Sequence, residues 1–296
     1  MTTTVQAGAL APAAGPDPIT EPGIYDMDNE TYHSHRYALS SSGARKLLAP
    51  SCPAKFRWEQ DHPQPPKKVF DIGNAAHKLV LGTGPDLVRI DADEWRTKAV
   101  KEEVAGVRAE GGIPLKPAEY EQVHAMADAL RAHPVASMLF DPEHGTAERS
   151  LFWRDEKTTV MLRARLDWLP NPRAGRLIIP DYKTCVSAEP ERLQRAVDEF
   201  GYHQQDDWYR RAARALDLAD DHAAFVFVCQ EKTAPYVITV IEVNATSRRI
   251  GAARNRAAIE RFAHCTATGH WPGYSDDVVP VALPGWAETR DTLEYL

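Results

Sequence analysis

The sequence predicts an α/β (α+β) fold in which a central mixed β-sheet is flanked by helices. The first observation is the segment 160–168, where apolar residues alternate with largely polar ones at a period of two, as in a half-buried strand. The second is the order of elements: helical patterns precede three strand-like segments, and two helices, two strands and a long helix follow them. Helices on both sides of a strand region predict a mixed sheet with helices packed against it.

Composition sets the limits of this prediction. The chain has 296 residues, a formal charge of −7 and 43 % hydrophobic residues, which is enough for a full core in one large or two small domains. No run approaches the ~18 apolar residues of a membrane span, and the N-terminus lacks a Sec-type signal pattern, so we expect a cytoplasmic protein without a membrane partner. The acidic balance argues against a protein that coats nucleic acid, but it leaves nucleic-acid enzymes open.

The N-terminal half is mainly helical. Residues 1–22 are rich in Ala, Pro, Gly and Thr and are expected to form a disordered tail. Ser40, Ser41 and Ser42 are possible N-caps of a helix over 44–48. An apolar stripe predicts a helix over 70–81, and a proline in the first turn opens another over 117–132. Residues 83–116 give no clear pattern.

The second half contains the strands. The segment 148–154 predicts one strand, and the segments 160–168 and 177–183 are predicted to form a hairpin across a turn at 171–175. Helices at 189–200 and 202–218, strands at 223–229 and 236–243, and a helix at 245–268 complete the chain. We expect a single domain over 23–285, with a mainly helical part (23–135), a core (146–268) and a C-terminal tail (286–296).

The residues that suggest chemistry lie on the predicted hairpin. Asp167 stands on the polar face of its strand, and Asp181 and Lys183, two residues apart, share one face of the next. In the right register the three side chains converge. Two carboxylates can hold Mg²⁺ with positions open for water and phosphate, and a lysine can orient the water or stabilise developing charge. The pattern therefore points to metal-assisted phosphodiester hydrolysis, with a solvated hairpin face as the alternative.

Neighbouring residues extend this site. Glu148, at the start of an adjacent strand, could supply another ligand, and Gln205 and Tyr209 lie one turn apart on the following helix. Pro180 precedes Asp181 and predicts a bulge, because proline fits poorly in a central strand.

Several polar residues have two alternative roles. Arg163 and Arg165 either pair with carboxylates or contact DNA phosphate. Ser40 and Ser42 are helix caps, and exposed N–H groups at a helix start also suit a terminal phosphate.

An ordered series of motifs resembles the RecE group (exodeoxyribonuclease VIII) of the PD-(D/E)XK nuclease superfamily, and this resemblance covers roughly residues 23–285. The motifs are Leu39–Ser42, His77 in Gly73–His77, Glu148, Asp167, Asp181–Thr184, Tyr202–Tyr209 and Gly269–Tyr274. The resemblance implies a restriction-endonuclease-like core. It also implies Asp167 and Asp181 as the main metal ligands, the Tyr182 carbonyl, His77 and Glu148 as further ones, Lys183 as the catalytic lysine, and Gln205 and Tyr209 as residues that position the scissile strand.

The same resemblance implies a function. We expect an exonuclease that uses Mg²⁺ (or Mn²⁺) to degrade one strand of double-stranded DNA from its ends, 5′ to 3′, in phage-type recombination within a bacterial host cell. Expected partners are DNA ends, a single-strand annealing protein (RecT-type) and further copies of the chain.

Three alternatives remain open at this point. One is a RecB-like nuclease with an iron–sulfur cluster, although Cys52, Cys185, Cys229 and Cys265 are scattered and predict ordinary thiols without a cluster. The second is an inactive nuclease-like scaffold for DNA ends or proteins, which the intact Asp167, Asp181 and Lys183 disfavour. The third is a small-molecule phosphohydrolase, for which no Gly-rich phosphate loop is present.

Overall fold

Two ten-residue strands, β5 (Gly145–Arg154) and β6 (Met161–Pro170), form the central hairpin of a four-stranded sheet. The computed structural model describes residues 17–62, 71–172 and 175–296. The sheet has the order β1-β5-β6-β2, with β1 (Gly23–Tyr25) antiparallel to β5 and β2 (Leu39–Ser40) parallel to β6. The period-two pattern correctly predicted β6, whose Leu162, Ala164 and Leu166 are fully buried.

A second, three-stranded sheet holds the other catalytic candidates. Its order is β7 (Ile178–Cys185), β8 (Ala224–Glu231) and β9 (Ile238–Glu242), with β7 parallel to β8 and β8 antiparallel to β9. The predicted hairpin of 160–168 with 177–183 is therefore wrong. One edge of β6 is taken by β5 along its length, and β7 pairs with a strand about forty residues further on. Local alternation identifies a strand, whereas its partner depends on contacts remote in sequence.

Pro180 does not interrupt β7. The parallel register runs unbroken from Ile178 opposite Ala224 to Cys185 opposite Glu231 and includes Pro180 opposite Val226, so the expected bulge is not formed. Because β7 is an edge strand of its sheet, it can contain a proline, which has no N–H to donate to a neighbouring strand.

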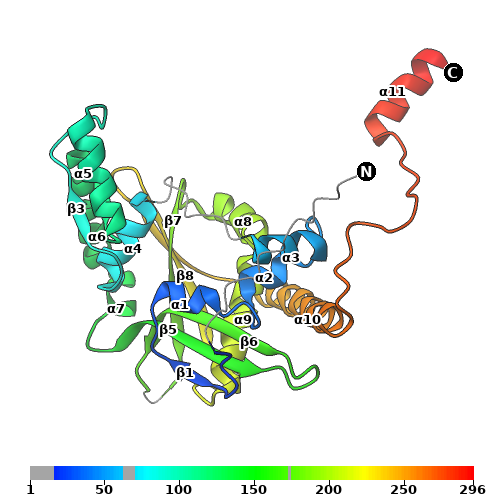
Figure 1. The fold of residues 1–296 in the computed structure, drawn as a ribbon, viewed down its shortest axis with the longest axis horizontal. Helices are drawn as coiled ribbons and strands as arrows, with labels where there is room; N and C mark the ends of the chain where they lie inside the picture. Colours follow the sequence, from blue (N-terminus) through cyan, green and yellow to red (C-terminus); the bar gives the residue numbers. More distant parts are fainter. Residues whose placement is uncertain (1–16, 63–70, 173–174) are drawn as a thin grey trace, which may run out of the picture.

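Helices cover the two sheets and place the polar loops around them (Figure 1). On one side lie α2 (Ser41–Lys46), α3 (Pro53–Asp61), α8 (Pro190–Glu199), α9 (Tyr202–Ala215) and α10 (Ala245–Thr268). Trp208 of α9 packs edge-on against Trp153 of β5, with ring centroids 5.8 Å apart, and both side chains are buried. The predicted N-cap is confirmed, since the Ser40 side chain accepts a hydrogen bond from the Gly43 N–H.

The segment 71–139 forms a lobe that projects to one side (Figure 1). It consists of α4 (Asp71–Leu81), β3 (Leu87–Arg89), α5 (Lys98–Ala109), β4 (Ile113–Leu115), α6 (Pro117–Ala132) and α7 (Ala136–Leu139). The predicted helix at 117–132 is confirmed, and the unassigned stretch 83–116 contains β3, α5 and β4. A second core joins this lobe to the sheets through Met126, Tyr182 and Val228.

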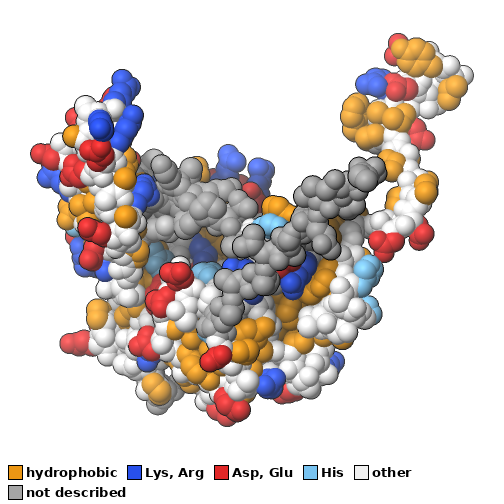
Figure 2. Space-filling model, viewed as in Figure 1, with side chains coloured by type: hydrophobic (Ala, Val, Ile, Leu, Met, Phe, Trp, Pro, Cys, Tyr) orange, Lys and Arg blue, Asp and Glu red, His pale blue; other side chains and the backbone are white. Residues whose placement is uncertain are grey.

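Two helices lie at the ends of the described chain. The first, α1 (Asn29–Ser34), packs its buried Tyr32 near the central sheet. The last, α11 (Gly285–Tyr295), falls in the segment expected as a tail and stands on an arm away from the other helices (Figure 1). Figure 2 shows hydrophobic side chains along this arm. Trp286 and Leu293 of α11 are both exposed. Among the described residues, no helix has the length and hydrophobicity needed to cross a membrane.

Candidate active site

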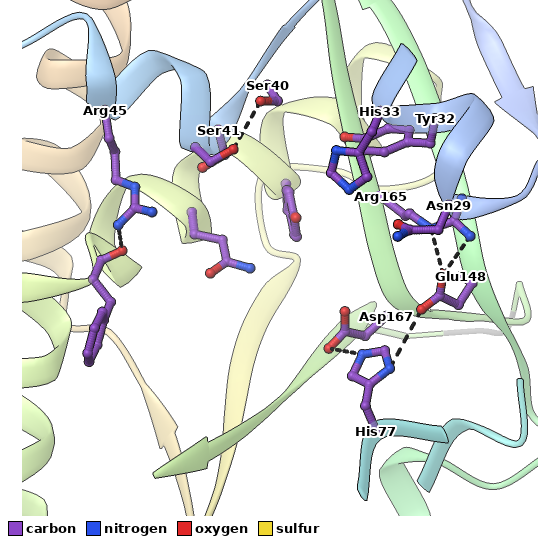
Figure 3. Close-up of a pocket in the computed structure, with 14 residues that line it drawn as sticks. Asn29, Tyr32, His33, Ser40, Ser41, Arg45, His77, Glu148, Arg165 and Asp167 are labelled. Carbon is purple, nitrogen blue, oxygen red and sulfur yellow. Dashed lines mark hydrogen bonds and ion pairs between the residues drawn. The ribbon is translucent and has the colours of Figure 1, made fainter. Parts of the chain in front are cut away.

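A cavity of about 320 Å³ opens between the central sheet and the helices around it, and Asp181 and Lys183 of β7 are not among its lining residues. Its wall includes α1 on one side and the start of α2 on the other, with residues of β5, β6, α4 and α9 between them (Figure 3). Of the residues predicted from the sequence, His77, Glu148, Arg165, Asp167, Gln205, Tyr209, Ser40 and Ser42 line this cavity.

Asp167 links the two sheets. Its carboxylate, on β6, accepts a hydrogen bond of 2.9 Å from the main-chain N–H of Tyr182 on β7. Burial alone would raise the pKa of Asp167, but His77, Lys183 and this N–H lower it below the usual value. Asp167 is therefore held ionised at the junction, directly beside the residue that precedes Lys183.

Asp181 is almost completely buried and is held by two side chains. One oxygen lies 2.5 Å from Nζ of Lys183, and the other accepts a hydrogen bond of 2.7 Å from the Gln205 amide. Burial and the nearby negative charge of Asp167 raise the pKa of Asp181 to about 7. Although burial opposes a charged amine, the two aspartates raise the pKa of Lys183 and keep it protonated. The structure thus brings together the three residues on which the sequence prediction depends.

His77 connects Asp167 to Glu148. Its Nε2 lies 3.4 Å from the Asp167 carboxylate and its Nδ1 lies 3.7 Å from the Glu148 carboxylate (Figure 3). Burial lowers the pKa of an imidazole, yet the two carboxylates outweigh it and the pKa of His77 is raised. The helix α4 thus places an imidazole between two acidic side chains.

The two predicted arginines differ in their surroundings. Arg165 forms an ion pair of 2.5 Å with Glu148 and also donates to the Ser150 hydroxyl, at one wall of the cavity. Arg163 is buried away from the cavity lining, stacks on the Tyr32 ring and donates to the Tyr32 carbonyl. Arg163 therefore joins α1 to β6, and a DNA contact by Arg163 stays a prediction.

The cavity wall contains residues that the sequence reasoning did not select. Arg45 of α2 donates to the Phe200 carbonyl, and Asn29 and His33 of α1 line the opposite side (Figure 3). Arg45 follows the Ser40–Ser42 cap by one helical turn, which is the one signal that could have indicated it. Asn29 and His33 lie in a short helix whose position depends on the buried Tyr32, so no local pattern marked them.

The donor set fits a hard divalent cation held by few protein ligands. Among the described residues, no three His, Cys, Asp and Glu side chains are grouped so as to hold a metal ion by themselves. Mg²⁺ usually binds one or two carboxylates and keeps several waters, whereas structural zinc needs four protein ligands. Asp167, which lines the cavity, and the buried Asp181, which is bonded to the cavity residue Gln205, are the two carboxylates available for the former arrangement.

Comparisons with known proteins agree with this fold. Residues 40–280 match the family described as "PDDEXK-like domain of unknown function (DUF3799)". No curated protein matches the chain. A solved structure titled "Putative exonuclease" from Eubacterium rectale is similar at a TM-score of 0.59 and 13 % sequence identity, over 90 % of this chain and 98 % of that one.

The matched region begins at the α2 cap and contains the aspartates, the lysine and α9, while α1 lies outside it. The structural likeness supports a restriction-endonuclease-like core fold, and the family match identifies the domain as PDDEXK-like, as the sequence predicted. Since the match spans most of the chain, this protein belongs to the DUF3799 family of PDDEXK-like domains.

Proposed function

We propose that this protein is a metal-dependent exonuclease that degrades one strand of double-stranded DNA from its ends, 5′ to 3′, as RecE-type enzymes do. The observation that carries the proposal is the convergence of Asp167, Asp181 and Lys183 at the junction of two sheets, beside a cavity. The family of PDDEXK-like domains and the likeness to a structure titled as an exonuclease support it. The strand polarity and the recombination role rest on the RecE resemblance.

The chain's own residues have distinct tasks in this proposal. Asp167 and Asp181 would hold Mg²⁺, with the Tyr182 carbonyl, Glu148 and His77 as further candidates. A bound Mg²⁺ lowers the pKa of a coordinated water and offsets negative charge on the phosphodiester. Lys183, kept protonated by the aspartates, supplies a positive charge that can orient the attacking water or stabilise the charge of the transition state. Gln205 donates a hydrogen bond to Oδ1 of Asp181, the oxygen that does not face Lys183, and Tyr209 lines the cavity where the scissile strand would lie.

DNA contacts would come from the cavity walls. Ser40 and Ser42 at the start of α2 and Arg165 beside Glu148 line the cavity, and we propose that they contact the end of the strand. Figure 2 shows acidic and basic side chains mixed over the visible face of the projecting lobe. We therefore assign the proposed DNA recognition to the cavity and not to this face of the lobe.

From the same resemblance we propose a homo-oligomer that encloses DNA and works with a single-strand annealing protein. The mass of the protein in solution, measured by light scattering after size-exclusion chromatography, tests the first part. A monomer at micromolar concentration that still degrades DNA would contradict it.

The decisive experiment is digestion of linear duplex DNA labelled at either the 5′ or the 3′ ends, with Mg²⁺ or with EDTA. Wild type is compared with Lys183→Ala and Asp181→Ala, and with a closed circular duplex as the substrate without ends. The proposal expects Mg²⁺-dependent loss of linear DNA by wild type alone, early release of the 5′ label, and an intact circle. Binding of ends without cleavage in Mg²⁺ or Mn²⁺ would favour the scaffold alternative, and cleavage of the circle would favour another nuclease type.

A further inference from the structure

Gln230 is a fully buried amide that lies outside the cavity and outside every motif of the sequence analysis. It stands in β8, opposite Thr184 of β7 and Ile238 of β9. A buried amide in the middle of an apolar strand is costly unless its hydrogen bonds are formed. The Gln230 side chain is therefore expected to have hydrogen-bond partners within the protein.

All of its polar atoms have partners. The carbonyl oxygen of the Gln230 side chain accepts a 2.6 Å hydrogen bond from the Tyr182 hydroxyl. The amide nitrogen donates to the Met126 carbonyl of α6 at 2.8 Å and to the Tyr236 carbonyl at 3.5 Å. Gln230 therefore connects the catalytic strand β7 to a helix of the projecting lobe, and a fully satisfied buried network of this kind makes the geometry rigid.

Tyr182 connects Gln230 to the candidate active site. Its hydroxyl is fixed by Gln230, while its main-chain N–H donates to the Asp167 carboxylate at 2.9 Å. The two bonds hold opposite ends of one residue that lies between Asp181 and Lys183 in sequence. Any rotation or shift of Tyr182 would therefore change the direction in which the N–H holds Asp167.

The same network locates His77. The Tyr182 ring packs in one core with Met126 of α6 and with Ala76, the residue next to His77 on α4. The centroids of the His77 and Tyr182 rings are 6.4 Å apart. A bond from β8 to α6 thus sets the distance between the lobe that carries His77 and the sheet that carries Asp181.

From this geometry we propose that Gln230, acting through Tyr182, is a positioning residue that aligns Asp167 with His77 and Asp181 for metal binding. The inference rests on the proposed metal-dependent nuclease function. Residues that orient metal ligands from behind commonly change metal affinity or activity by about 10–100-fold when replaced. Gln230 touches neither DNA nor metal in this assignment.

The test is Mn²⁺ binding by the whole protein without DNA, followed through the electron paramagnetic resonance signal of the free ion. Tyr182→Phe removes one hydroxyl and keeps the ring, Gln230→Met removes the amide at nearly constant volume, and the third variant carries both changes. We expect each single variant to bind Mn²⁺ about ten-fold more weakly or worse. Because the two residues act through one bond, the double variant should be no weaker than Gln230→Met.

Gln204→Met is the matched control. Gln204 is also a buried glutamine with side-chain hydrogen bonds, to Asn255 and Arg254, but these lie in the contact of α9 with α10. This variant should lose thermal stability and keep the Mn²⁺ affinity of wild type.

Three outcomes would overturn the assignment. One is wild-type Mn²⁺ affinity in both single variants, and another is a double variant whose loss equals the product of the single losses. The third is an equal loss of affinity in Gln204→Met, which would show a general effect of stability. A wild-type protein that neither binds Mn²⁺ nor cuts DNA would overturn the proposed function together with it, so the wild-type measurement separates the two failures.

Discussion

Glu148 and Asp167 face each other across the β5–β6 hairpin at a break in its pairing. The strands pair at Ala147 with Trp168 and again at Arg149 with Leu166, but the intervening position is left unpaired. Glu148 has a positive φ of 57°, a conformation that costs a non-glycine residue about 1–2 kcal/mol. The distortion turns the Glu148 carboxylate toward Arg165 and His77. Backbone strain is thus concentrated at the candidate site.

Removing only the charge of Glu148 tests what this arrangement contributes. Glu148→Gln keeps the length of the side chain and the backbone strain, but it weakens the charged pair with the half-buried Arg165. We expect a loss of about 1–2 kcal/mol in the free energy of unfolding, measured with urea. Glu156→Gln, at an exposed position in the loop of the same hairpin, should change stability by less than about 0.5 kcal/mol. Equal effects of the two variants would mean that the Glu148 pair contributes nothing to stability.

Two features of position 201 favour glycine: its positive φ, and the close approach of the Arg45 side chain. Its φ is +66°, and an added Cβ would lie 2.3 Å from Cδ of Arg45. Gly269, at the end of α10, has a φ of +70° with open space around the added atom. Gly269→Ala should therefore cost about 1 kcal/mol from conformation alone. Gly201→Ala should cost about 1–2 kcal/mol more, because Arg45 must move away from the Phe200 carbonyl.

The two alanine variants also differ in their expected effect on the cavity. Arg45 lines the cavity, so Gly201→Ala should weaken binding of a labelled duplex end in fluorescence anisotropy, while Gly269→Ala should not. If the two variants lose the same stability and bind DNA ends alike, Arg45 is not held by the close approach at Gly201.

His77→Ala tests the imidazole between two carboxylates. Without the imidazole, Asp167 and Glu148 lose the group that lies between them and holds their orientation. We expect DNA cleavage in Mg²⁺ to fall about 10–100-fold, with the folded structure retained in circular dichroism. His222→Ala, at an exposed position, is the control and should cleave at the wild-type rate. Unchanged cleavage by His77→Ala would exclude His77 from the site.

Asp206 should make the stability of the protein depend on pH. It is fully buried on α9, its carboxylate accepts no hydrogen bond among the described residues, and the nearest charge, on Arg210, is 3.6 Å away. Burial raises the pKa of Asp206 to about 7, with Arg210 and Arg248 opposing the rise and Asp207 and Glu242 adding to it. Between about pH 4 and pH 7 the folded protein therefore holds a proton that the unfolded chain releases.

The sign follows from this difference in protonation. Because the folded state binds the extra proton, stability is lost as pH rises through this window. Asp206→Asn removes the ionisable group, so relative to wild type it should gain stability of the order of 2–4 kcal/mol between pH 5 and pH 8. Urea unfolding of both proteins at the two pH values measures the gain. If the difference in unfolding free energy between wild type and Asp206→Asn were the same at both pH values, the raised pKa of Asp206 would be contradicted.

Sequence periodicity predicted the elements but not their partners. The alternation around Leu162 and Leu166 and the Ser40 cap are local signals, and both were confirmed because neighbouring residues alone decide them. The hairpin of 160–168 with 177–183 was wrong because pairing is chosen by remote strands. The convergence of Asp167 with Asp181 nevertheless arises, through a side-chain bond to the Tyr182 N–H in place of shared strand pairing.

Other site features had no local signal. The strands β1 and β2 have three and two residues, which is too few for an alternating pattern to be recognised in the sequence. They nevertheless form the two edges of the central sheet. Gln230 is a single polar residue in an apolar strand, and its role depends on Tyr182 and Met126, which are far from it in sequence.

The separation of β6 and β7 into different sheets has a mechanical consequence. Two carboxylates on one hairpin keep a spacing fixed by the strand ladder, whereas the spacing of Asp167 and Asp181 depends on how the two sheets pack against each other through their shared core. Substitutions in the packing between the two sheets, many residues away from either aspartate in sequence, therefore change the distance between the two carboxylates. In this protein the distance between the acidic groups is a property of the whole domain's assembly.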